Sequence, residues 1–313
     1  MIRKNNEQSV ILSRGFTDLI KLVAAILVAF GHYASHALSF SSNPIYRITV
    51  MFAGNVGVAL FFLLSGYGLM MSERKNHIAF WPFVKRRLSK VYMPVVIVSF
   101  VWQLILWPSE AGWERIPNLL YATFWGFSDG ILWFVKAILI CYLFFRIYLY
   151  FRNISRKAQF AALLVGTAIV YAIVYVIYAS WAAISIPLFS LGILIADENR
   201  RCCQVLRSWW ILIAVAVITL VMGILYIWQG NLYLHSLCNW YVVFALLTLG
   251  SFFVIEIKVP SWLGDISYDI YITHNKVINY LKPIYGNISL LHFVVGTMIA
   301  ATASCMIRKM LKV

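Results

Sequence analysis

The segment Arg14–Tyr33, RGFTDLIKLVAAILVAFGHY, decides the fold class because it is long and apolar enough to cross a bilayer. It nevertheless contains Asp18, Lys21 and His32. An ionisable side chain is costly in hydrocarbon unless it faces a cavity or a partner. A helix brings Lys21 and His32 within about 20° of one face, with a rise of roughly 16 Å between them. The helix face shared by Lys21 and His32 predicts a functional site inside a membrane helix bundle.

The whole chain has the composition of a membrane protein. Of its 313 residues, 62% are hydrophobic and 12% are charged, whereas about a quarter of the residues in an ordinary soluble domain are charged. The net charge of +15 is compatible with nucleic-acid binding, but the basic residues lie between apolar segments. We therefore expect the lipid bilayer, and no nucleic acid, to be the partner of this charge.

Ten apolar segments are candidates for membrane-spanning helices. They predict an all-α, polytopic membrane bundle of about ten transmembrane helices, with residues 1–313 forming a single membrane-embedded domain. The expected ranges are 16–35, 48–71, 91–107, 130–149, 160–178, 182–196, 209–228, 237–255, 266–284 and 288–307.

The distribution of Lys and Arg predicts the orientation of this bundle. One set of connecting loops carries 20 of these residues and the opposite set carries 3. Cytoplasmic loops of membrane proteins are enriched in Lys and Arg, and an even number of spans brings both ends of the chain to one side. We therefore expect cytoplasmic N and C termini.

The motifs of several enzyme and transporter classes are missing. The sequence contains no Walker A run, no G-x-G-x-x-G and no H-E-x-x-H. Ser65 lies in LLSGY, which lacks the glycine that precedes the nucleophile in a hydrolase elbow. The five cysteines have no metal-ligand spacing, and we expect no metal site. ATP-driven transport, zinc proteolysis and serine hydrolysis are all disfavoured.

Polar residues that could take part in catalysis or binding occur in five separate segments. They are Lys21-x10-His32 with Asp18 before it; Gly57–Gly66, GVALFFLLSG; Arg86, Arg87, Lys90 and Pro94; Trp133-Phe134; and Ser267-Tyr268 with His274. In this order these segments resemble the signature of the bacterial acyltransferase 3 family of integral membrane O-acyltransferases. The resemblance covers nearly the whole chain, although Lys90 replaces the family's arginine.

The resemblance implies transfer of an acyl group, most often acetyl from acetyl-CoA, to a hydroxyl group of a cell-envelope or secreted glycan. Acyl-CoA is then a donor substrate, and no permanently bound cofactor is expected. With cytoplasmic termini, we expect a multi-pass protein of the bacterial cytoplasmic (inner) membrane.

The donor side of the site follows from charge. Acyl-CoA is cytosolic and strongly anionic, and Arg86, Arg87 and Lys90 lie on the expected cytoplasmic side, where they would hold its phosphates. Lys21, deeper in the bundle, is expected to guide the diphosphate or the pantetheine arm.

The catalytic residues are expected on the first helix. His32 would act as general base toward the acceptor hydroxyl. Lys21 would lie on the same helix face in a shared channel, which opens to the donor on one side and to the glycan on the other. Trp133 and His274 are the expected substrate-contacting residues.

Simpler interpretations remain open. Lys21 can form an ion pair with Asp18 at i,i+3. The basic loop can set the membrane topology without binding a ligand, and His274 can form a hydrogen bond between helices. For the whole chain, buried charges also suit a transporter or flippase, although we find neither repeats nor paired broken helices. Another membrane acyltransferase architecture, with a buried histidine and asparagine, fits the chain length less well.

Overall fold

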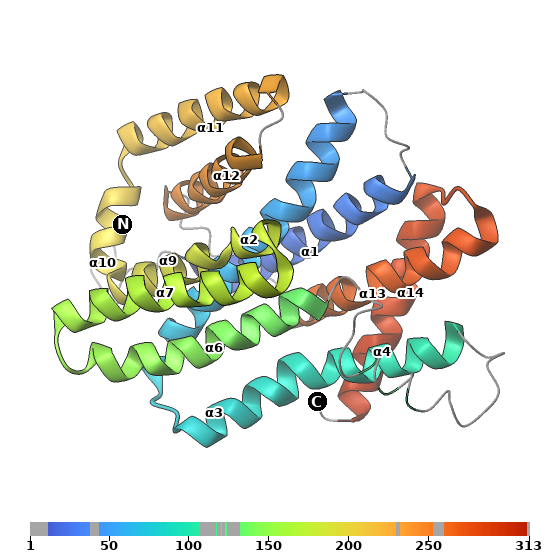
Figure 1. Ribbon diagram of the computed structural model, residues 1–313, viewed down its shortest axis with the longest axis horizontal. Helices are drawn as coiled ribbons and strands as arrows, with labels where there is room; N and C mark the ends of the chain where they lie inside the picture. The colour runs from blue at the N-terminus through green and yellow to red at the C-terminus, as the bar shows by residue number, and fades with distance from the viewer. Residues whose placement is uncertain are drawn as a thin grey trace, which may run out of the picture.

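The computed structural model describes residues 12–37, 44–106, 132–229, 232–252 and 260–311, together with residues 117, 120 and 123. Within these residues the chain is helical and contains no strand (Figure 1). The helices are α1 (Arg14–Ala37), α2 (Pro44–Lys75), α3 (Phe80–Arg87), the π-helical turn η1 (Leu88–Tyr92), α4 (Met93–Leu106), α6 (Leu132–Arg152), α7 (Arg156–Tyr178), α8 (Ser180–Ala183), α9 (Ile186–Asp197), α10 (Asn199–Leu206), α11 (Trp209–Gln229), α12 (Leu232–Phe252), α13 (Ser261–Tyr285) and α14 (Leu290–Met310).

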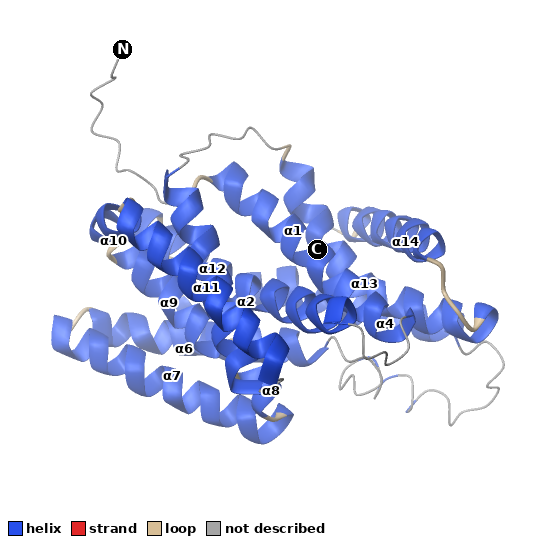
Figure 2. Cartoon of the chain, turned by 90° about the horizontal axis from the view of Figure 1, so that it is seen from above, coloured by secondary structure: helices blue, strands red, loops and turns tan. Residues whose placement is uncertain are grey.

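Helix α2 lies at the centre of the bundle. It packs against α1, α9, α12 and α6. On its other side α1 packs against α13, which in turn pairs with α14. Figures 1 and 2 show α6 beside α7 and α11 beside α12 on one flank of α2, with α13 and α14 on the opposite flank. The first and second helices therefore sit between the two halves of the molecule.

Glycines allow these central helices to approach closely. A Cβ atom on Gly66 of α2 would collide with the backbone of Phe189, and one on Gly192 of α9 would collide with the backbone of Leu63. Gly57 lies in the same way against the backbone of α1. In lipid, helices associate by such close packing of small residues, because apolar side chains gain nothing by leaving lipid.

Over its described residues, each expected span lies largely within one helix or within two consecutive helical segments, which are η1 with α4 and α8 with α9. Seven helical segments in the described part of the chain are long and apolar enough to cross a membrane: Arg14–His36, Ala53–Lys75, Phe80–Ile105, Trp133–Arg152, Arg156–Tyr178, Ser180–Asp197 and Leu290–Met310. Helices α11 and α12 contain shorter apolar stretches, Trp209–Leu225 and Asn239–Ser251. Helix α13 carries four charged residues, Asp265, Asp269, Lys276 and Lys282. The structure supports a multi-pass helical membrane protein with seven candidate spans, where the sequence predicts about ten.

The basic segment expected to be a loop is helical instead. Helix α3 begins at Phe80 and runs through η1 into α4 without a break. The π turn ends two residues before Pro94, which has no N–H to donate to the preceding turn. Such single π turns are frequent at functional sites. Arg86, Arg87 and Lys90 are therefore held on a helix rather than on a loop.

Helices α13 and α14 are joined by a buried ion pair. Asp269 is fully buried and accepts hydrogen bonds from Arg308 Nε, at 2.8 Å, and from Ser304 Oγ, at 2.7 Å. Breaking a buried pair of this kind leaves an uncompensated charge, which costs about 3–5 kcal/mol. The contact fixes the N-terminal part of α13 against α14.

Candidate functional site

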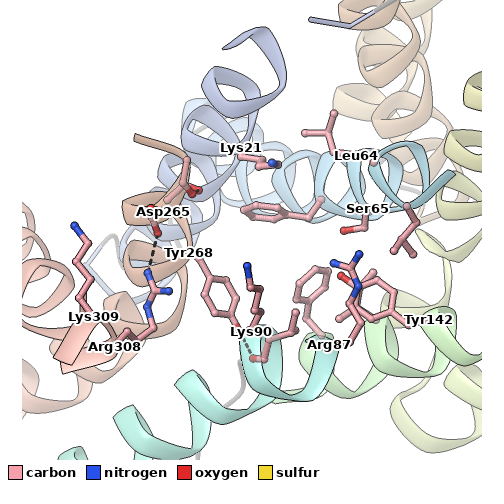
Figure 3. A pocket seen from close by; sticks show the side chains of 18 residues that line it. Lys21, Leu64, Ser65, Arg87, Lys90, Tyr142, Asp265, Tyr268, Arg308 and Lys309 are labelled. Carbon is pink, nitrogen blue, oxygen red and sulfur yellow. Dashed lines mark hydrogen bonds between the residues drawn. The ribbon is translucent and has the colours of Figure 1, made fainter. Parts of the chain in front are cut away.

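A cavity of about 530 Å³ opens between α1, α2, η1, α6, α13 and α14 (Figure 3). We call it the basic cavity. Its polar lining consists of Lys21, Ser65, Arg87, Lys90, Tyr142, Asp265, Ser267, Tyr268, Arg308 and Lys309. The volume falls in the range of small-molecule sites. The five cations against one carboxylate in this lining make it suited to an anion.

Two of these cations already have acidic partners. Lys21 Nζ lies 2.9 Å from Asp18 Oδ1, so the i,i+3 pair considered above is present. Arg308 is held by Asp269. Both residues still border the cavity, but their charges are largely balanced.

Arg87 and Lys90 are less compensated. The Arg87 guanidinium lies 5.3 Å from the ring centroids of both Phe83 and Tyr142, and its Nε atom is buried without a hydrogen-bond partner. Figure 3 shows Lys90 rising from η1 into the space between Tyr268 and Arg87. Among the described residues neither Arg87 nor Lys90 forms an ion pair with a carboxylate. They are the charges best placed to receive an anionic ligand.

The π turn is anchored to the cavity wall. The Tyr268 hydroxyl donates a hydrogen bond to the Val91 carbonyl, as Figure 3 shows. This contact ties α13 to the turn that carries Lys90. Arg86, grouped with Arg87 and Lys90 by the sequence, is exposed and does not line the cavity.

His32 lies in a second, smaller pocket of about 180 Å³, which we call the histidine pocket. Its polar and aromatic lining consists of His32, Ser35, Asn55, Trp133, Trp181 and Tyr271. The rings of Trp133 and Trp181 meet edge to face, with centroids 4.9 Å apart. The structure thus places Trp133 and His32 in the lining of the same pocket.

His274 contacts His32 and lines neither cavity. It is completely buried, and its Nε2 atom lies 3.3 Å from His32 Nδ1. The Nδ1 atom of His274 lies 3.1 Å from the Ile270 carbonyl, which can only accept a hydrogen bond. His274 Nδ1 therefore donates to this carbonyl, and in the neutral imidazole Nε2 accepts a hydrogen bond from His32 Nδ1. The side chain of Asn275 also hydrogen-bonds His32.

The same four helices line both cavities. Helix α1 contributes Lys21 to the basic cavity and His32 to the histidine pocket, and α6 contributes Phe134 and Trp133 in the same order. Helices α2 and α13 likewise border both. The two spaces therefore follow one axis through the bundle, although they are separate cavities and not the single channel that the sequence suggests.

Comparison with known proteins agrees with this arrangement. A family model described as an acyltransferase domain matches residues 14–309, nearly the whole chain. The chain belongs to the acyltransferase 3 family. No curated protein and no solved structure matches it.

All five segments of the acyltransferase 3 signature contribute residues to the two cavities or to their contacts. The sequence interpretation missed others, namely Tyr142, Arg308 and Lys309 in the basic cavity and Asn55 and Trp181 in the histidine pocket. Arg308 and Lys309 belong to the 20 basic residues from which the sequence predicts only the orientation of the bundle. Tyr271 of the histidine pocket was also missed, although a signal for it exists, because it lies three residues from both Tyr268 and His274 and within the same arc of about 120° on the helix.

Proposed function

We propose that this protein transfers an acyl group, most often acetyl, from acyl-CoA to a hydroxyl group of a cell-envelope glycan. Membership of the acyltransferase 3 family supports acyl transfer. The observation that carries the proposal is the alignment of an anion-binding cavity and a histidine pocket along the same four helices.

In this proposal the basic cavity receives the donor. Arg87 and Lys90 bind the phosphates of acyl-CoA, because their charges lack carboxylate partners among the described residues and arginine can bind phosphate through two parallel hydrogen bonds. Lys21, balanced by Asp18, lies on α1 and guides the pantetheine arm toward His32. The cavity faces the cytoplasm, where acyl-CoA is made, in the orientation that the Lys and Arg distribution favours.

In the histidine pocket, His32 acts as the general base of the transfer reaction. Since His32 Nδ1 donates to His274, its Nε2 lone pair is the basic one and accepts the proton of the acceptor hydroxyl. The hydroxyl oxygen attacks the thioester carbonyl carbon, the C–S bond breaks, and the CoA sulfur leaves and takes up the proton. His274 fixes the tautomer and orientation of His32 and is a positioning residue. Trp133 and Trp181 offer aromatic faces, and Asn55 a polar group, to the sugar.

The decisive experiment measures release of the CoA thiol by the purified protein given acetyl-CoA and candidate glycans, together with mass spectrometry of the glycan. We expect His32→Ala to lower transfer by about 10²–10⁴-fold, the range of a general base. His36→Ala is the matched control, because His36 lies one turn further along α1 and is exposed outside the pocket. Full activity of His32→Ala at normal protein levels would refute the role, and glycan movement without thiol release would favour a transporter.

A further inference from the structure

Three aromatic rings stand between the two cavities. Phe61 of α2 and Phe134 of α6 line the basic cavity, whereas Tyr271 of α13 lines the histidine pocket. The ring centroids of Phe61 and Phe134 lie 5.5 Å and 5.3 Å from that of Tyr271, and 5.8 Å from each other. Each ring touches both others, so the three form a closed triangle. Phe134 and Tyr271 are only 6% and 3% exposed.

This triangle is where the linings of the two cavities contact each other. A ligand bound by Arg87 and Lys90 lies on the Phe61 side of the rings, and His32 lies on the Tyr271 side. We propose that Phe61, Phe134 and Tyr271 form an aromatic gate that separates the basic cavity from the histidine pocket and opens to admit the acyl-bearing arm of the donor. The role of the gate in transfer rests on the proposed function, whereas the barrier itself does not.

Phe61 is the ring best able to move. Phe134 is held by further contacts with Phe62 and Trp133, at centroid distances of 5.0 Å and 6.0 Å, and Tyr271 also contacts His274 at 5.9 Å. Phe61 is less buried than either and contacts the two other gate rings. Its rotation toward the basic cavity would open the path while the two better-held rings stay in place.

A closed gate has a chemical consequence. Water that reaches His32 from the histidine pocket cannot meet a thioester held behind the rings, so acyl-CoA is protected until its arm has passed. An open gate exposes the thioester to water activated by His32. The water oxygen then attacks the carbonyl carbon, the C–S bond breaks, and the products are a free carboxylic acid and the CoA thiol.

The barrier is tested by sided labelling that does not depend on activity. Val58→Cys places a thiol in the wall of the histidine pocket, one turn from Phe61 on α2. A small, anionic, membrane-impermeant methanethiosulfonate is added to sealed vesicles on the side that carries Lys90, and mass spectrometry follows modification at position 58. We expect Phe61→Ala to accelerate labelling at least tenfold.

Phe62→Ala is the matched control. It removes a neighbouring, fully buried ring that contacts Phe134 but lines neither cavity. We expect it to accelerate labelling far less than Phe61→Ala does, since it loosens the packing of Phe134 but leaves all three gate rings in place. Equal labelling rates with Phe61 and with Phe61→Ala would overturn the gate, and so would equal acceleration by Phe62→Ala.

Enzyme measurements then separate the gate from the proposed function. Phe61→Ala should raise thiol release from acetyl-CoA in the absence of glycan several-fold, and the bulkier Phe61→Trp should lower transfer while it slows labelling further. Labelling that responds to Phe61 in a protein without any transfer activity supports the gate and refutes the proposed function. If Phe61→Ala does not change the labelling rate in an enzyme that is active, the gate alone is refuted.

Discussion

At the scale of single residues, two neighbouring arginines face different surroundings. Arg87 lines the basic cavity and has a buried Nε atom without a hydrogen-bond partner, whereas Arg86 is exposed outside the cavity. A flexible basic loop would give both the same role. The helix formed by α3 and η1 instead separates them by about 100°. This difference makes the pair a test of where the donor binds.

We expect Arg87→Ala to raise the KM for acetyl-CoA roughly tenfold or more, because a hydrogen bond to a charged group contributes about 1.5–3 kcal/mol. Arg86→Ala should leave it nearly unchanged. Steady-state kinetics of thiol release over a range of acetyl-CoA concentrations measures both. Equal effects of the two substitutions would mean that surface charge, and not the cavity, attracts the donor.

At the scale of helices, glycine contacts hold α2 in the centre of the bundle. Gly66 and Gly192 place the backbones of α2 and α9 against each other, so neither helix can accept a larger residue at the crossing. Gly68, two residues further along α2, borders the basic cavity and has open space where a Cβ atom would lie. The two positions differ in packing while they share a helix.

Gly66→Ala should therefore destabilise the protein by about 1–3 kcal/mol, the usual cost of overpacking. Gly68→Ala should be neutral or slightly stabilising, because alanine is favoured over glycine in helices by about 1 kcal/mol. Thermal unfolding of the two variants in the same detergent compares them. A Gly66→Ala variant as stable as Gly68→Ala would show that the α2–α9 contact is looser than described.

Helices and their approximate ranges are largely predictable from this sequence, whereas the site is predictable only in part. Apolar length is a local property, so each expected span coincides with helix. The shared face of Lys21 and His32 is equally local, and the structure places each in a cavity. The gate depends on rings from α2, α6 and α13, and tertiary packing of this kind leaves no periodic signal. In the sequence Phe61 is indistinguishable from any apolar residue of a span.

At the scale of the whole molecule, the same basic residues bear on both membrane orientation and ligand binding. Arg87, Lys90, Arg308 and Lys309 border one cavity and also belong to the set of 20 basic residues that predicts the cytoplasmic side. The charges expected to orient the protein in the membrane are thus also those expected to attract the donor. The connection between α13 and α14, at Gly286–Ser289, lies at the other end of α13 from Asp265.

Reporter fusions test this orientation. Alkaline phosphatase joined after Val313 should be inactive, because it stays in the reducing cytoplasm, and the same enzyme inserted at Asn287 should be active. A fluorescent protein that matures only in the cytoplasm should give the reverse pattern at the two positions. Phosphatase activity at Val313 would place the basic cavity on the wrong side for cytosolic acyl-CoA.

Trp133 and Phe134 are consecutive residues of α6, yet Trp133 borders the histidine pocket and Phe134 borders the basic cavity. A small rotation of this helix about its own axis would change the shape of both the basic cavity and the histidine pocket. Occupancy of the two should therefore be thermodynamically linked. If a bound donor raises the affinity for the sugar, the bound sugar must raise the affinity for the donor by the same factor.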